Sequence, residues 1–261
     1  MLKCEKYQVV GWEHAIRGMR NPKNSWEKSD SDWCKDVHAC HCCPCYDMEH
    51  DCCAYSPYYD IGPNDHDLMT KLRNAGTDHR KFMRMLTVYV DITAPLYWWK
   101  EYDTYKVGTV ANSCSTMHTI HKKEFTLDDF SHERLLSPLN YRGRKDAIPF
   151  VDVTPTKSGD ILFSPLGVLQ YVVIPMLNDC RKRYIDYDGC DGIYKKDLWE
   201  QMIQLLPTSY NQKRTVMLNY EVLANIYKSR KNHKLTEWHT LCDWIESLPY
   251  SELITGGKKD A

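Results

Sequence analysis

Two amides and an arginine recur at helical spacing near the C-terminal end of the sequence. Asn219, Asn225 and Arg230 span about three turns of a helix that has 3.6 residues per turn. Between them lies an apolar stripe that would face a core, formed by Val222, Leu223, Ile226 and Tyr227. Amide groups and a planar guanidinium beside a buried stripe suit the recognition of a flat, hydrogen-bonding anion.

A second set of reactive side chains gathers near the N-terminus, where seven of the twelve cysteines lie between residues 34 and 53. Thiolates and imidazoles are good zinc ligands, so one interpretation of these residue types is a structural zinc site. The alternative is a surface insertion at about 34–55 with reduced thiols, because the two separate C-x-x-C pairs of a zinc finger are absent. The zinc ligands would be Cys40, His41, Cys43 and Cys45.

Two segments in the middle of the chain could form a ligand site or ordinary structure. Residues 94–102 are rich in aromatic rings and contain Glu101, which would accept N–H groups of a stacked heterocycle or belong to a core helix. Residues 108–118 are small and polar, and they would cradle a phosphate or form a loop that enters a helix. The run Asp186 to Gly192 lacks the ligand spacing of a calcium loop and is interpreted as a solvated acidic turn.

Composition excludes several classes of protein. The 261 residues carry a net charge of −1 and are 43% hydrophobic and 26% charged, so a core can form and no basic field favours nucleic acid or an anionic membrane. The N-terminal residues have no apolar signal segment, and no apolar run is long enough to span a bilayer. We expect a cytoplasmic protein with few disulfides.

Periodicity predicts a mixed α+β chain whose second half is rich in helices. A short strand at Tyr7–Val10 enters a helix, and Asn64 or Asp65 would cap the next one. Residues 82–93 alternate as a half-buried strand, and Pro95 suits the first turn of a helix from Leu96 to about Tyr105. Further helices are expected over residues 166–185, 196–206, 216–231 and 235–247.

Taken in order, these segments resemble the flavin-dependent thymidylate synthases. The likeness covers roughly residues 64–118 and 165–245. It is carried by Asp78-His79, Ala94-Pro95-Leu96-Tyr97, Lys100-Glu101-Tyr102, Leu206-Pro207, Asn219, Asn225, Arg230, His233 and Glu237.

The sequence also departs from that family's signature, which is Arg-His-Arg-x-x-Ser-x-Asn-Glu-x-Ser-x-Arg-Tyr. Aligned on Asn112 and Ser115, this chain has Tyr105-Lys106-Val107 for Arg-His-Arg, Ser113 for Glu, and Met117-His118 for Arg-Tyr. Ile203 and Glu221 also stand where the family has arginine. Each lost charge-assisted contact is worth about 1.5–3 kcal/mol. The candidates to replace that charge are Lys100, Lys106, Arg17, Arg20 and Lys213.

The resemblance implies a single domain over residues 1–261, with a mixed antiparallel sheet flanked by helices. It also implies methylation of dUMP, or of a related pyrimidine nucleotide, with methylenetetrahydrofolate as the one-carbon donor. FAD would be the cofactor, NADPH would reduce it, and the active sites would be shared within a homotetramer. Arg230 would be the catalytic residue, polarising the pyrimidine carbonyl. The nucleotide would contact Glu101, Ser113, Ser115 and Arg230, and the flavin would contact His79, Lys106, Asn112, Asn219, Asn225 and His233.

Two alternatives stay open at this point. The lost arginines are compatible with a relative that binds a nucleotide but no longer catalyses a reaction. The cysteine cluster is compatible with a zinc-organised module that binds a protein or a nucleic acid.

Overall fold

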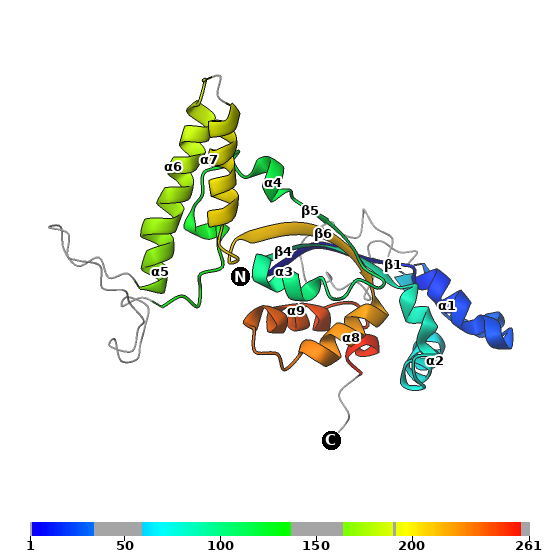
Figure 1. Cartoon of the computed structure of the whole chain (residues 1–261). Helices are drawn as coiled ribbons and strands as arrows, with labels where there is room; N and C mark the ends of the chain where they lie inside the picture. Colours follow the sequence, from blue (N-terminus) through cyan, green and yellow to red (C-terminus); the bar gives the residue numbers. More distant parts are fainter. Residues whose placement is uncertain (1, 34–58, 137–163, 190–191, 257–261) are drawn as a thin grey trace, which may run out of the picture. The chain divides into compact units, whose positions relative to one another are not determined.

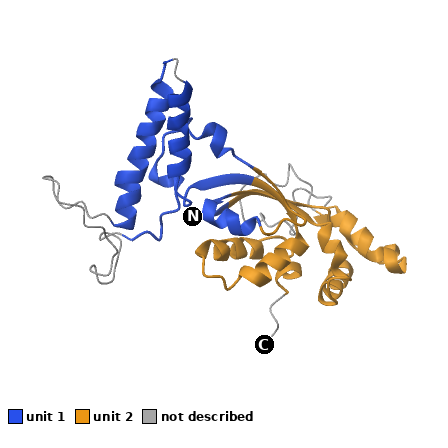
Figure 2. Cartoon of the chain, viewed as in Figure 1, with its two compact units in different colours: residues 1–3, 93–103, 113–214 blue, residues 4–92, 104–112, 215–261 orange. Residues whose placement is uncertain are grey.

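The structure is a computed structural model that describes residues 2–33, 59–136, 164–189 and 192–256. The chain forms two compact units, which Figure 2 colours separately. Unit 1 comprises Met1–Lys3, Thr93–Asp103 and Ser113–Arg214, and unit 2 comprises Cys4–Ile92, Thr104–Asn112 and Thr215–Ala261. Each unit draws on three separate stretches of sequence, and the single domain expected over 1–261 stays a prediction.

Four strands form an antiparallel sheet in the order β1-β4-β6-β5 (Figure 1). The strands are β1 (Lys3–Val10), β4 (Thr87–Pro95), β5 (Val110–Ser113) and β6 (Asn211–Asn219). Val88, Val90 and Ile92 of β4 are buried in alternation, as their spacing predicts. A second pair, β2 (Asp32–Trp33) and β3 (Tyr59–Asp60), is antiparallel with Asp32 opposite Asp60. The predicted α+β class with an antiparallel sheet is confirmed.

Unit 2 contains the helices α1 (Trp12–Arg20), α2 (Pro63–Asn74), α8 (Tyr220–Arg230), α9 (Thr236–Glu246) and α10 (Glu252–Thr255). Among the described residues of this unit, short 3-10 helices accompany them: η1 (Asn21–Lys23), η2 (Trp26–Lys28) and η4 (Arg80–Arg84). α8 packs against α9, α10 and η4, and η4 also contacts α1 and α2. The apolar stripe predicted on α8 faces this core, because Leu223 and Ile226 are fully buried.

Unit 1 contains α3 (Leu96–Tyr102), α4 (Thr116–Thr119), the 3-10 helix η5 (Leu127–Asp129) and α5 (Pro165–Val168). A π-helical turn η7 (Leu169–Val173) follows α5 and leads into α6 (Ile174–Asp186), which packs against α7 (Gly192–Leu205). A core cluster that includes Phe125, Phe130, Leu177 and Met202 is buried in this unit. A capping box is present at η5, between Thr126 and Asp129.

Two predicted element boundaries are wrong, because the pattern of buried side chains in each segment fits a different element. Residues 216–219 were expected in a helix but end strand β6, because Val216 and Leu218 are buried at the two-residue period of a strand. Residues 82–86 were expected in a strand, but Phe82 and Met83 are buried side by side in η4. Two consecutive buried side chains do not fit a strand with one buried face.

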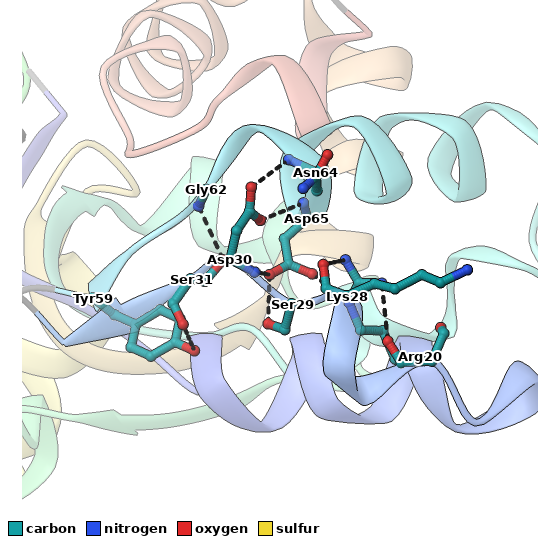
Figure 3. Close-up of polar contacts among 10 residues, drawn as sticks. Arg20, Lys28, Ser29, Asp30, Ser31, Tyr59, Gly62, Asn64 and Asp65 are labelled. Atoms are coloured by element: carbon teal, nitrogen blue, oxygen red, sulfur yellow. Dashed lines mark hydrogen bonds and ion pairs between the residues drawn. The ribbon is translucent and has the colours of Figure 1, made fainter.

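The start of α2 is held by a polar network that joins it to α1 and to residues 28–31 (Figure 3). Nε of Arg20 donates to Oδ1 of Asp65 at 2.6 Å, and the hydroxyls of Ser29 and Ser31 donate to Oδ2 at 2.6 and 2.7 Å. Asp65 is fully buried and Arg20 is 4% exposed. Burial acts to raise the pKa of Asp65, but these hydrogen bonds and the charge of Arg20 outweigh burial and lower it.

This network corrects two expectations about the sequence. α2 begins at Pro63 after Gly62, and the carboxylate of Asp30 accepts the N–H groups of Asn64 and Asp65. Neither Asn64 nor Asp65 is therefore the cap. The guanidinium of Arg20 is buried and paired with Asp65, so it does not replace a lost phosphate contact.

Candidate functional site

Asn219 lies where strand β6 ends and helix α8 begins. Its Oδ1 accepts the N–H of Val222 at 3.0 Å, which makes Asn219 the N-cap of α8 rather than a residue within it. The expected helix through Asn219 is thus replaced by a strand-to-helix junction. The cap fixes the amide of Asn219 at the first turn of α8.

Arg230 lies in the last turn of α8, where a cation is favoured by the helix dipole. Its Nε donates to the hydroxyl of Tyr105 at 2.9 Å. Its guanidinium carbon lies 4.6 Å from the ring centroid of Trp238, which is fully buried in α9, and 5.6 Å from that of Tyr105. A hydrogen bond and two aromatic rings therefore orient this half-buried arginine.

His233 follows α8 and joins the same group of rings. Its Nδ1 accepts the N–H of Leu235 at 3.2 Å, so in the neutral ring the proton is on Nε2. Its ring centroid lies 6.2 Å from that of Trp238 in an edge-on arrangement. Tyr105, Arg230, His233 and Trp238 are named here the arginine–aromatic cluster.

Gly108 brings a distant segment against the start of α8. Its φ of +77° lies in the region that favours glycine, and an added Cβ would lie 3.1 Å from both Nδ2 of Asn219 and Cγ2 of Val222. Residues 104–112 therefore touch α8 at its N-terminus through Gly108 and at its C-terminus through Tyr105. Both contacts lie inside unit 2.

No protein-family model matches the sequence, and no curated protein matches it. Solved structures do match it. Thymidylate Synthase X from Helicobacter pylori, solved with FAD and dUMP, aligns with a TM-score of 0.55 and 17% sequence identity, over 98% of this chain and 97% of that chain. A UMP/dUMP methylase, PolB from Streptomyces cacaoi, bound with 5-Br dUMP, aligns with a TM-score of 0.51 and 12% identity, over 98% of this chain and 95% of that chain.

The chain has the fold of the flavin-dependent thymidylate synthases.

Glu221, which the sequence alignment places at an arginine of the family, pairs with two arginines within unit 2. Glu221 of α8 is 7% exposed and accepts hydrogen bonds from Arg80, at 3.3 Å from Nε, and from Nε of Arg84. Burial acts to raise the pKa of Glu221, but the hydrogen bonds and charges of Arg84 and Arg80 outweigh it and lower that pKa. Two arginines and one carboxylate leave a net positive charge around Glu221. The sequence analysis did not identify Arg80 and Arg84. The signal that could have found them was Glu221 itself, because a carboxylate aligned with an arginine calls for new basic partners.

Four predicted flavin contacts have exposed side chains outside the arginine–aromatic cluster. His79 precedes η4, Lys106 lies in the loop after α3, Asn112 lies on β5, and Asn225 lies on the exposed side of α8. Their surfaces are open to solvent, so the fold leaves them accessible to a ligand. Their roles as flavin contacts stay predictions.

The predicted nucleotide contacts other than Arg230 belong to unit 1. Ser113 is exposed at the end of β5, and Oγ of Ser115 accepts the N–H of His118 at 3.1 Å as the N-cap of α4. Glu101 lies half-buried on α3, where Trp98, Trp99 and Tyr102 are buried. The burial of these three rings favours the core-helix interpretation of residues 94–102 over a wall of stacked ligand contacts.

The proposed zinc ligands Cys40, His41, Cys43 and Cys45 lie outside the described residues. Among the residues that the structure does describe, no group of three or more His, Cys, Asp or Glu could hold a metal ion. Burial raises the pKa of Cys4 to about 12 and that of Cys242 to about 11, which keeps these two thiols protonated. In the same described part of the chain, no helix is both long and apolar enough to cross a membrane.

Proposed function

We propose that the protein methylates dUMP, or a related pyrimidine nucleotide, by a flavin-dependent reaction. The observation that carries this proposal is the contact of residues 104–112 with both ends of α8. Tyr105 and Arg230 are 125 positions apart in the sequence, yet they share a hydrogen bond of 2.9 Å. Residues 104–112 and α8, which belong to the two segments that resemble the flavin-dependent thymidylate synthases, thus meet in unit 2.

Arg230 is the residue that we propose to stabilise charge on the nucleotide. A guanidinium is planar, always charged and able to donate from several N–H groups in fixed directions. Its bond to Tyr105 and its place over Trp238 hold the plane in one orientation before a ligand arrives. A donor oriented in advance lowers the energy of a developing oxyanion without reorganisation, which suits a pyrimidine carbonyl during methyl transfer.

The donor set of unit 2 fits FAD as the cofactor. Lys106 supplies a positive charge for the pyrophosphate, and the amides of Asn112, Asn219 and Asn225 supply hydrogen bonds for the flavin edge. His79 and His233 supply imidazole N–H groups for the same edge. When bound and reduced, FAD would supply a hydride equivalent to the nucleotide.

The remaining components of the reaction are part of the same proposal. Methylenetetrahydrofolate would donate the one-carbon unit, and NADPH would reduce the flavin. Glu101, Ser113 and Ser115 would contact the nucleotide in a homotetramer whose sites are shared between subunits. The protein would work in the cytoplasm.

A nucleotide-binding relative without catalysis is the second candidate. It is favoured by Tyr105-Lys106-Val107, which stand where the family has Arg-His-Arg, and by Glu221, which stands where the family has arginine. Tyr105 orients Arg230 but carries no charge for a pyrophosphate. The pair Arg80 and Arg84 restores positive charge at Glu221 and argues for retained ligand binding.

Release of tritium from dUMP labelled at C5 separates the two candidates. With FAD, NADPH and methylenetetrahydrofolate, we expect release from the wild-type protein and a loss of about 100-fold or more in Arg230→Gln, the effect of deleting one preorganised donor. The matched control is Arg183→Gln, an exposed arginine of α6 in unit 1, which should react as the wild type does. Thermal stabilisation by dUMP without tritium release would establish the second candidate instead. The absence of both effects would contradict both candidates.

A further inference from the structure

A pocket of about 380 Å³ opens in unit 1 between α4, α6 and α7. All of its lining residues belong to unit 1, whereas Arg230 and the cluster around it belong to unit 2. The side chains that define its chemistry are His118, His121, Tyr184, Lys195, Lys196 and Trp199. Its volume lies in the range of about 300–1,000 Å³ that is typical of small-molecule sites.

The walls of the pocket are tied together by hydrogen bonds. Nε1 of Trp199 donates to the carbonyl of Met117 at 2.9 Å, which joins α7 to α4. Nε of Arg181 donates to the carbonyl of His121 at 2.9 Å, which joins α6 to the segment after α4. The pocket is therefore formed before any ligand binds.

Positive charge dominates the lining. Nζ of Lys195 lies 5.2 Å from the ring centroid of Tyr184 and donates to the carbonyl of Tyr187 at 3.5 Å. Within the described residues, Lys195 has no carboxylate in salt-bridge contact. Lys196 pairs with Glu200 at 3.4 Å, but both side chains are exposed, so this pair is weak and a ligand anion can compete for the lysine.

The other walls are aromatic. The ring centroids of His121 and Tyr184 lie 4.9 Å apart, and Trp199 is half-buried between solvent and the core. Nδ1 of His121 is buried and has no hydrogen-bond partner among the described residues. Rings of this kind provide faces and edges on which a flat ligand packs.

We propose that this pocket binds a small ligand that joins a flat ring to a phosphate group. The cations of the lining are two lysines, and no arginine of the lining offers the fork that matches a carboxylate. Lysine acts on phosphate as a point charge, and the aromatic walls select the ring. This inference does not rest on the proposed function, because the residues that carry it are separate from Arg230 and its partners.

Isothermal titration calorimetry of the full chain tests the pocket with AMP, phenyl phosphate, adenosine and inorganic phosphate. We expect AMP and phenyl phosphate to bind, with adenosine and inorganic phosphate each weaker by about tenfold or more, because each lacks one half of the recognised group. Lys195→Met and Lys196→Met should each weaken AMP binding by about fivefold to tenfold. Lys182→Met, an exposed α6 residue outside the lining, should leave it unchanged.

Four results would overturn the proposal. The first is that AMP gives no binding heat at millimolar concentration, and the second is that adenosine or inorganic phosphate binds as tightly as AMP. The third is that neither lysine variant weakens AMP binding, and the fourth is that Lys182→Met weakens it as much as they do. Lys196 is exposed, so its variant tests the charge even if Lys195→Met fails to fold. Arg230→Gln should leave AMP binding intact, so a failure of the proposed function and a failure of this site give different results.

Discussion

The hydroxyl of Tyr105 is a sensitive place to test the proposed role of Arg230. Tyr105→Phe removes the oxygen that lies 2.9 Å from Nε of Arg230 and keeps the ring, whose centroid is 6.1 Å from that of Trp238. A hydrogen bond to a charged group is worth about 1.5–3 kcal/mol when buried, and the lower end applies because Arg230 is half-buried. A loss of about 1–1.5 kcal/mol corresponds to a fivefold to tenfold loss of dUMP affinity.

The assay is the dissociation constant of dUMP measured by calorimetry, together with the free energy of unfolding in urea. Because the ring packing is retained, we expect the free energy of unfolding to fall by less than about 1 kcal/mol. Tyr89→Phe is the matched control, since Tyr89 is an exposed residue of β4. Affinity within about twofold of the wild type in Tyr105→Phe would refute the reasoning. So would an equal loss in Tyr89→Phe.

The two buried ion networks give further predictions. Arg20→Met leaves the fully buried carboxylate of Asp65 without its cation and should lower the free energy of unfolding by about 3–5 kcal/mol in urea. Asp67→Asn removes an exposed pair with Lys71 and should cost less than about 0.5 kcal/mol. Glu221→Gln should cost roughly 1–2 kcal/mol near neutral pH, because Arg80 and Arg84 lose their shared acceptor.

The pH dependence of Glu221→Gln has a defined sign. The pKa of Glu221 is lowered in the folded state, so its contribution to stability is present above the usual glutamate value of about 4.3. That contribution is lost as the pH falls through the lower pKa of the folded state. The difference between wild type and variant should therefore be complete near pH 7 and shrink as the pH falls below about 4.3. A constant difference would contradict the ion-pair account, as would an equal cost for Arg20→Met and Asp67→Asn.

Local sequence patterns predicted the elements in which the spacing of apolar residues matches the spacing of buried side chains. The helix expected at 235–247 is α9 (Thr236–Glu246), and the alternation of Val88, Val90 and Ile92 identified β4. The helix prediction was wrong at 216–219, where a strand with a period of two residues runs directly into a helix with a period of 3.6 residues. A window that spans such a junction averages the two periods, and only the cap at Asn219 marks the boundary.

The contacts that assemble the site depend on tertiary structure. Arg230 was identified by type and spacing, but its partner Tyr105 was regarded only as a lost arginine. Glu221 was regarded as a loss of charge, because its partners Arg80 and Arg84 are more than a hundred residues away in the sequence. Pairings over such separations are set by the fold, and local periodicity carries no information about them.

The central claim is most directly tested by the visible absorption of the protein-bound flavin in a single anaerobic turnover. The protein is loaded with FAD, the flavin is reduced with one equivalent of NADPH, and its absorption band is followed as substrates are added. The account predicts that the oxidised band returns only when dUMP and methylenetetrahydrofolate are both present. A protein that binds no FAD would contradict the account, as would a reduced flavin that stays bleached with both substrates present.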